Sequence, residues 1–240
     1  MNDPGPADRL LLYATPAHEC SYLPAREAVT LFADPDHPKD PWLQGVLTRQ
    51  GFRRSGVHLY RPRCPRCSAC EAARVPVREF APSRSQRRTW RGNRDLAVRI
   101  VPQCFVEEHY ALYARYVVTR HAGGGMDEPN PAKYRDFLLC PWADTRLIEF
   151  RDGGRLLAVA VCDRLPDALS AVYTFFDPDA AARGLGVHAV LWQIESARNE
   201  GLSWLYLGYA IDGCRKMQYK ACFRPQERLR GGRWLRLERS

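Results

Sequence analysis

The chain has 240 residues, of which 45% are hydrophobic and 26% charged, and its formal net charge is +9 at pH 7. This composition excludes a disordered chain, a coiled coil and a collagen. The longest apolar run, Leu156–Cys162, is far shorter than the roughly 20 residues that span a bilayer. The first residues lack the basic start and apolar stretch of a signal peptide. We therefore expect a cytoplasmic protein without membrane contact, built from one large or two small domains.

Residues 1–95 show little regular periodicity and are rich in Cys and Arg. Pro24–Phe32 predicts a helix with proline in its first turn, and Trp42–Gln50 predicts a second short helix. The alternation of Val75–Phe80 predicts a strand. We treat residues 1–95 as one predicted domain.

Residues 96–240 alternate more clearly between strands and helices and form the second predicted domain. The predicted strands cover 96–101, 146–151, 156–163, 169–177 and 204–211. The predicted helices cover 106–121 and 131–140, and a third follows the turn at 183–186 and runs to about residue 199, where Gly201 ends it.

This order is an antiparallel meander followed by a glycine-rich turn, a helix and a strand. It matches the acyltransferase fold related to Gcn5-type N-acetyltransferases. In that fold the backbone N–H groups of the turn before the helix hold a phosphate, a role that falls here to Arg183, Gly184 and Gly186. The predicted fold class is therefore α+β, with a Gcn5-related N-acetyltransferase-like domain after a Cys/Arg-rich N-terminal domain.

The positive charge is concentrated in two segments. Residues 53–94 contain twelve arginines and only two acidic residues, and residues 215–239 contain nine basic residues against two acidic ones. The chain as a whole has 32 Arg and 4 Lys, so a preference for Arg explains the residue type but not its clustering. The clustering favours a polyanionic partner; the alternative is a solvated basic face.

The run Cys64-Pro-Arg-Cys67-Ser-Ala-Cys70 places three thiols on one tight turn. Cys20 is the best candidate for a fourth ligand, with His18 or His58 as alternatives. Zinc and a [4Fe–4S] cluster both suit such a thiolate set, and a loop of free thiols is the alternative. The nine cysteines are odd in number, which argues against a disulfide framework.

Two further clusters contain basic or polar side chains that could bind a ligand, and the first suits phosphate groups. Residues 53–56 together with residues 83–88, which include Arg84, Gln86, Arg87 and Arg88, offer donors for phosphate oxygens. The aromatic residues Phe52, Tyr60 and Trp90 nearby suit the stacked bases of a single-stranded RNA end. A solvated basic face is again the alternative.

The second cluster holds two of the four lysines. Lys216 and Lys220 are four residues apart, so on a helical turn they would share a face, with Tyr219 close by.

Taken together, these segments resemble the arginyl-tRNA–protein transferase family, in its bacterial branch of aspartate/glutamate leucyltransferases. The segments that carry the resemblance are 20–24, 50–56, 60–70, 83–88, 113–121, 175–178, 183–186, 206–209 and 214–225. Two positions depart from the family's pattern: Ala210 stands where an aromatic residue is usual, and Asp212 where a basic one is usual.

The resemblance implies that leucine is moved from Leu-tRNA to proteins that begin with Asp or Glu, which marks them for degradation in the N-degron pathway. It implies aminoacyl-tRNA and these acceptor proteins as partners and a monomeric enzyme. The transfer itself requires no cofactor, because the acceptor α-amine, with a pKa of about 7.7–8.0, is partly neutral already and the donor is an activated ester. Positioning is expected to supply most of the rate.

The candidate site residues follow from this chemistry. His121, Tyr209 and Tyr219 are candidates for moving a proton, and helix capping is the alternative role for His121. A cationic clamp for the acceptor carboxylate falls to Arg215, Lys216 and Lys220, with Arg53 and Arg54 as competitors.

Three alternative functions stay open at the level of the sequence. Arginine is the alternative donor, for which the Asp212 carboxylate would be suited. A CoA-dependent N-acetyltransferase explains the turn at residues 183–186 but not the basic segment. A zinc- and RNA-binding module explains the cysteines and arginines but leaves the second domain without a role.

Overall fold

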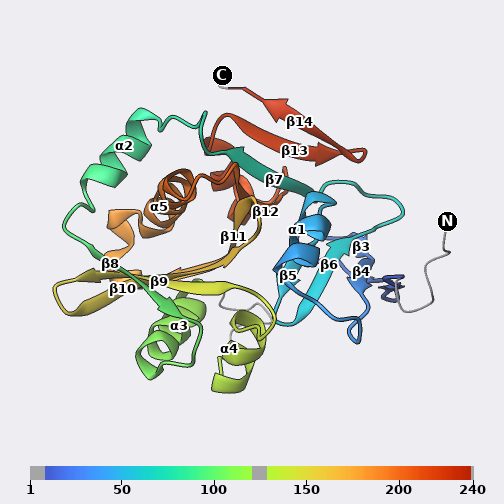
Figure 1. Ribbon diagram of the computed structural model, residues 1–240, viewed down its shortest axis with the longest axis horizontal. Helices are drawn as coiled ribbons and strands as arrows, with labels where there is room; N and C mark the ends of the chain where they lie inside the picture. Colours follow the sequence, from blue (N-terminus) through green and yellow to red (C-terminus); the bar gives the residue numbers. More distant parts are fainter. Residues whose placement is uncertain (1–8, 121–128, 239–240) are drawn as a thin grey trace.

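The computed structural model describes residues 9–120 and 129–238, which form a mixed α/β structure around one large sheet (Figure 1). The sheet has eight strands, all antiparallel to their neighbours except the parallel pair β11 and β12. In spatial order they are β14 (Arg233–Leu237), β13 (Gln226–Arg230), β7 (Glu71–Pro76), β12 (Trp204–Ala210), β11 (Ala168–Phe176), β10 (Arg155–Arg164), β9 (Thr145–Asp152) and β8 (Ala97–Pro102).

Helices cover both faces of this sheet. The helices are α2 (Arg84–Arg91) and α5 (Leu185–Asn199) on one face, and α3 (Glu107–Arg120) and α4 (Pro131–Leu138) on the other. In β10, Ala158 and Ala160 pack in the α5 core, whereas Val159 and Val161 pack in the α3 and α4 core. A strand covered on both faces is apolar along its length, which explains the unbroken run that the sequence shows there.

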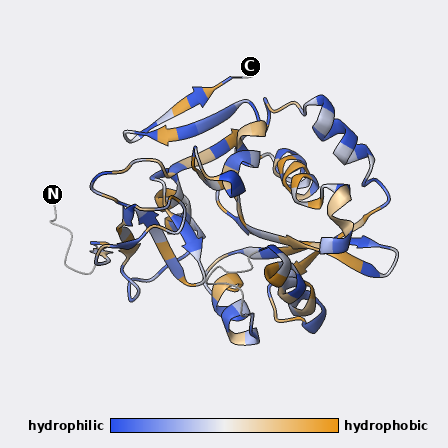
Figure 2. Ribbon diagram, turned by 180° about the vertical axis from the view of Figure 1, so that it is seen from behind, coloured by the Kyte–Doolittle hydropathy of each residue, from blue (hydrophilic) through white to orange (hydrophobic). Residues whose placement is uncertain are grey.

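Most elements predicted for residues 96–240 are confirmed. The strands β8 to β12 and the helices α3, α4 and α5 lie where periodicity predicted them, within one or two residues, and Cys162 is 1% exposed. Figure 2 shows α5 as largely hydrophobic and α2 as largely hydrophilic. A short 3-10 helix, η2 (Pro178–Arg183), leads into α5.

A smaller sheet precedes the large one. Its strands, in spatial order, are β1 (Leu12–Ala14), β4 (Thr30–Ala33), β6 (His58–Pro62) and β5 (Arg53–Ser55), and α1 (Pro41–Arg49) packs beside it. A two-stranded ladder joins β2 (His18–Glu19) and β3 (Glu27–Ala28). The helix α1 was predicted; Asp40 caps it by accepting from the Leu43 N–H.

The helix predicted for Pro24–Phe32 is wrong. This segment forms β3 and β4 instead, and Phe32 pairs with Tyr60 on β6. Val29 and Thr30 are β-branched and Phe32 is aromatic, and such side chains suit a half-buried pleated surface better than a short isolated helix.

The first 95 residues contribute strands to both sheets. Strand β7 lies between β12 and β13 in the large sheet, and α2 packs on α5. The chain therefore passes from one sheet to the other between β6 and β7. The domain boundary near residue 95 stays a prediction.

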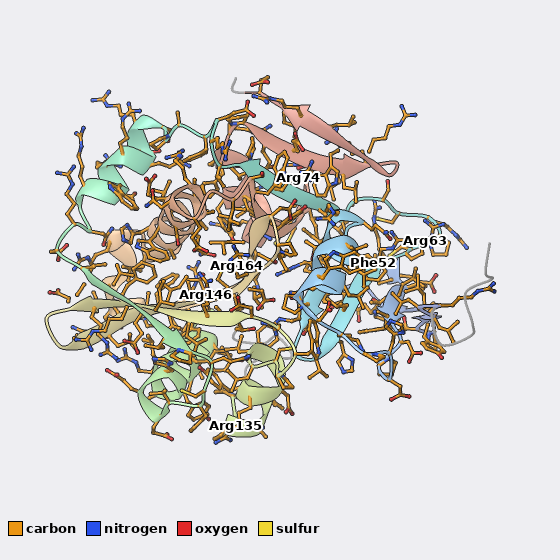
Figure 3. The ribbon with its side chains drawn as sticks, viewed as in Figure 1. Phe52, Arg63, Arg74, Arg135, Arg146 and Arg164 are labelled. Carbon is orange, nitrogen blue, oxygen red and sulfur yellow. The ribbon has the colours of Figure 1, made fainter. Side chains whose placement is uncertain are left out.

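The hairpin of β13 and β14 is fixed to the sheet through Arg74, which is labelled in Figure 3. Its guanidinium carbon lies 3.6 Å from the Trp204 ring centroid and 4.2 Å from that of Trp234. Its Nη2 also lies 2.6 Å from the Glu227 carboxylate. A cation over two indole rings binds both, so Arg74 joins its own strand β7 to β12, β13 and β14. None of the helices in the described part of the chain has the length and apolar character needed to cross a bilayer.

Candidate functional site

The parallel strands β11 and β12 separate in the middle of the large sheet. They pair only where residues 168–170 meet residues 204–206. Beyond that point, side chains from other segments donate hydrogen bonds to backbone carbonyls of both strands. The Arg53 guanidinium donates to the Val172 carbonyl of β11 at 3.1 Å, and the Lys220 amine donates to the Tyr209 carbonyl of β12 at 2.7 Å. Two basic residues from distant segments thus meet where the sheet opens.

Gly208 makes room for one of them. Its φ is +74°, and its strand is bulged against β7 between Tyr206 and Gly208. A Cβ atom at this position would collide with the guanidinium of Arg53. Glycine suits both the left-handed backbone and the close approach of Arg53 to this strand. The glycine of the Tyr-Leu-Gly-Tyr sequence in β12 therefore leaves space for the Arg53 side chain.

Arg53 is half-buried and forms no ion pair with any residue in the two described ranges. Burial opposes its charge, nearby phenols favour it, and the pKa of Arg53 is raised overall. These phenols belong to Tyr60, Tyr209, Tyr22 and Tyr219. A guanidinium without a carboxylate, in surroundings of this kind, is suited to bind an incoming anion.

Lys220 is 4% exposed and lies on the 3-10 helix η3 (Arg215–Cys222). Burial, and after it the charge of Arg53, holds the pKa of Lys220 well below its usual value. The ring centroid of Tyr219 lies 6.0 Å from its amine. The two basic residues of the site therefore differ: Arg53 is a permanent cation, whereas burial shifts the Lys220 amine toward its uncharged form.

The other acceptor-binding candidates are placed differently. Arg54 points away from Arg53 and is buried against Asp163, with Nε 2.6 Å from Oδ2, so its charge is already paired. Arg215 and Lys216 are exposed. Because a 3-10 helix has three residues per turn, the predicted shared face of Lys216 and Lys220 is wrong: one is exposed and the other buried.

The proton-transfer candidates are also placed differently from one another. Tyr209 is 1% exposed, and its hydroxyl lies 2.9 Å from the Gly51 carbonyl and 3.2 Å from that of Tyr60. Burial raises the pKa of Tyr209, so this phenol stays protonated and ties β12 to the small sheet. Tyr219 is 46% exposed beside Arg53. His121 lies outside the described residues.

The arginine-rich helix α2 presents Arg84, Arg87 and Arg88 to solvent. Gln86, in contrast, is 4% exposed: it closes the capping box with Ser83 and donates to the Cys222 carbonyl at 3.1 Å. It holds the helix in place, and the neighbouring arginines remain available to a phosphate backbone.

The turn before α5 has the glycine geometry that the sequence predicts, but its arginine is paired with carboxylates. Gly184 has a φ of +66° and precedes the helix, with Gly186 in its first turn. The Arg183 guanidinium, however, lies 2.6 Å from Asp95 and 3.3 Å from Asp152. Its charge is compensated within the protein.

The cysteines predicted to hold a metal gather without forming a ligand set. Burial first, and then the neighbouring Cys20, Cys64 and Cys67 thiols, raise the pKa of Cys70 to about 12. Cys64 accepts from the Val29 N–H at 3.5 Å. No group of three or more His, Cys, Asp or Glu side chains within 9–120 and 129–238 is arranged to hold a metal ion. The zinc or [4Fe–4S] cluster that the sequence suggests for these cysteines stays a prediction.

The sequence does not predict Tyr22 or Gly208 as site residues, and it suggests Tyr60 only as a surface for stacked bases. Tyr22 and Tyr60 approach Arg53, and Gly208 adjoins it. All three lie in segments that carry the family resemblance, so the signal was present in motifs whose individual roles only the fold assigns.

The described residues thus define an α/β protein with a cationic site at a split in its sheet. Two family models match the chain: "Arginine-tRNA-protein transferase, N terminus" over residues 18–88 and "Arginine-tRNA-protein transferase, C terminus" over residues 108–230. The chain belongs to the arginine-tRNA-protein transferase family.

Its sequence relatives are more specific than the family name. The chain is 53% identical over 229 residues to the aspartate/glutamate leucyltransferase of Stutzerimonas stutzeri (strain A1501), covering 95% of this chain and 97% of that protein. It is 51% identical over 226 residues to the enzyme of the same name from Hahella chejuensis (strain KCTC 2396), covering 94% and 97%.

Among solved structures, FemX matches with a TM-score of 0.47 and 8% identity, over 86% of this chain and 81% of that one. L-PGS from Bacillus licheniformis matches with a TM-score of 0.47 and 13% identity, over 60% and 47%.

Proposed function

We propose that this protein transfers leucine from Leu-tRNA to the N-terminal Asp or Glu of acceptor proteins. The observation that carries the proposal is the identity of about half of all residues, over nearly the full length of both chains, to proteins named aspartate/glutamate leucyltransferase. The exposed arginines of α2 supply the positive surface that a tRNA backbone requires.

In this proposal Arg53 binds the side-chain carboxylate of the acceptor. It is the half-buried cation of the site that lacks an ion-pair partner within the described ranges, and it is held by the Val172 carbonyl and by Gly208. A fixed guanidinium distinguishes Asp and Glu from neutral residues by a charge-assisted hydrogen bond. Arg54 takes no part, because Asp163 already neutralises it.

The large sheet, in the same proposal, is an acyltransferase fold related to Gcn5-type N-acetyltransferases. The separation of β11 from β12 and the left-handed Gly184 that opens α5 support this assignment. The reacting ester would enter at the separation, next to Arg53 and Lys220.

The test is a transfer assay with purified protein. Labelled Leu-tRNA or Arg-tRNA is mixed with peptides that begin with Asp, Glu or Ala. We expect leucine on the Asp and Glu peptides and none on the Ala peptide. Arginine transfer would replace the donor, and acetyl-CoA binding without any transfer would favour an N-acetyltransferase.

The clamp is tested with the variant R53M. Losing one charge-assisted hydrogen bond is worth about 1.5–3 kcal/mol, so KM for the Asp peptide should rise about 10- to 100-fold. R99M, which removes an exposed arginine of β8, is the control and should leave KM unchanged.

A further inference from the structure

We propose that Lys220 is a catalytic base of this reaction: its uncharged amine takes a proton from the α-ammonium group of the acceptor. The inference rests on the proposed function and adds to it a group that activates the nucleophile. The candidates chosen for that task from sequence were His121, Tyr209 and Tyr219; of these Tyr209 is bound to carbonyls.

The surroundings of Lys220 disfavour an ammonium ion. The amine is buried and donates to the Tyr209 carbonyl at 2.7 Å. The groups that face it are the Arg53 guanidinium from β5, the Cys214 thiol ahead of η3 and the Tyr219 ring on η3. Within the described residues Lys220 forms no ion pair with a carboxylate. A buried cation beside another cation, with a single carbonyl as partner, is costly; a neutral amine is not.

The acceptor fits this pair of side chains. An N-terminal Asp or Glu carries a carboxylate and an α-ammonium only a few bonds apart. Arg53 offers a permanent positive charge for the first, and Lys220 offers a lone pair for the second. Arg53 binds the Val172 carbonyl of β11 and Lys220 binds the Tyr209 carbonyl of β12, on the two strands that separate here, so in this proposal one acidic residue lies against both.

The step balances without a cofactor. Lys220 Nζ takes one proton from the ammonium group, and the free amine attacks the ester carbonyl of Leu-tRNA. The new C–N bond forms as the ester C–O bond to the terminal ribose breaks. The second proton on the attacking nitrogen passes to the departing ribose oxygen, and Lys220 releases its proton to water.

The experiment measures single-turnover leucine transfer from preformed Leu-tRNA between pH 6 and pH 8. K220M removes the base. K220Q also cannot accept the proton but keeps a donor for the Tyr209 carbonyl. K39M is the matched control, because Lys39 also donates to backbone carbonyls, those of Pro35 and His37. Circular dichroism and tRNA binding establish that each variant is folded.

We expect K220M and K220Q to be slower than the wild type by about 10²- to 10⁴-fold, and K39M to be unchanged. The loss of rate in K220M and K220Q should grow as the pH falls, because these variants can use only acceptor molecules that bind as the free amine. The free-amine fraction decreases tenfold per pH unit below the pKa of the acceptor amine. The loss of rate should shrink for a peptide that begins with 3-fluoroaspartate, because the electron-withdrawing fluorine makes its α-amine less basic.

Wild-type transfer combined with unchanged K220M and K220Q rates would overturn the inference. So would a defect of equal size at every pH and with both peptides, because that pattern indicates a packing role. Absence of transfer by the wild-type protein from Leu-tRNA would overturn the proposed function, and this inference with it.

Discussion

Arg54 and Asp163 form a buried ion pair that joins β5 of the small sheet to β10 of the large one. Arg54 Nε lies 2.6 Å from Oδ2 of Asp163, and Nη2 lies 2.8 Å from Oδ1. The same carboxylate accepts from Gln44 Nε2 at 2.6 Å and from Thr145 Oγ1 at 2.7 Å. Because neighbouring residues of a strand point to opposite sides, Arg53 reaches the split in the sheet while Arg54 holds the two sheets together.

The variant R54M should therefore destabilise the protein more than it perturbs the chemistry. It leaves the Asp163 carboxylate, which is 0% exposed, without its cation. Breaking a buried pair in this way costs about 3–5 kcal/mol of the free energy of unfolding, which urea denaturation would measure. The double variant R54M/D163L removes the stranded charge and should recover part of the loss. Equal stability of R54M and the wild type would contradict the assignment.

The sequence predicts the second half of the fold well because its elements are long and periodic. Strand β10 has ten residues and α5 has fifteen, and each carries a clear apolar pattern. The strands of the small sheet have three to five residues, and β2 and β3 have two each. Segments that short contain too few side chains to show a period, so Pro24–Phe32 resembled a helix start although cross-strand pairing decides its structure.

The site could be predicted only as a set of candidates. Basic residues near positions 53 and 220 were chosen from motifs, but their different charge states depend on tertiary neighbours. The pKa of Lys220 is lowered because η3 is a 3-10 helix that buries this side chain, and after burial because of the charge of Arg53. Arg54 and Arg183 are neutralised by carboxylates that lie far away in the sequence. Charge counting cannot distinguish a paired arginine from a free one.

His188 makes the protein sensitive to acid. Its side chain packs against Trp90 and Phe150, and burial, followed by the charge of Arg183, lowers its pKa to about 4. In the unfolded chain His188 takes up a proton near pH 6.5, whereas the folded protein resists this until about pH 4. Stability is therefore fully present above pH 6.5 and falls as the pH drops toward 4, by about 2–3 kcal/mol at pH 4.5.

Urea denaturation at pH 7 and pH 4.5 measures this loss. The variant H188F keeps an aromatic ring without the titrating group, so its stability should change less between the two pH values. If H188F loses as much stability as the wild type, another group causes the acid sensitivity.

A side chain at position 208 should displace Arg53. In G208A the added methyl group meets the guanidinium of Arg53, and the backbone must hold alanine at a φ of +74°. The left-handed backbone alone costs about 1–2 kcal/mol. G153A is the matched control, because Gly153 also has a positive φ, +56°, but has no atom within 4 Å of the new methyl group. Both variants should lose stability, whereas only G208A should raise KM for an Asp peptide, and equal KM values would argue against Arg53 as the clamp.

The arginines of α2 should determine how salt affects tRNA binding. Arg88 and Arg91 are exposed and make no ion pair within the described ranges, so their charges are free for phosphate groups. Each lost phosphate contact reduces the slope of log K against log salt by about 1. R88A/R91A should therefore bind tRNA more weakly and with a slope smaller by about 2, measured by filter binding between 50 and 200 mM salt. R49A is the control, because Asp167 already lies 3.3 Å from the Arg49 guanidinium; the same slope in all three proteins would place the tRNA on another surface.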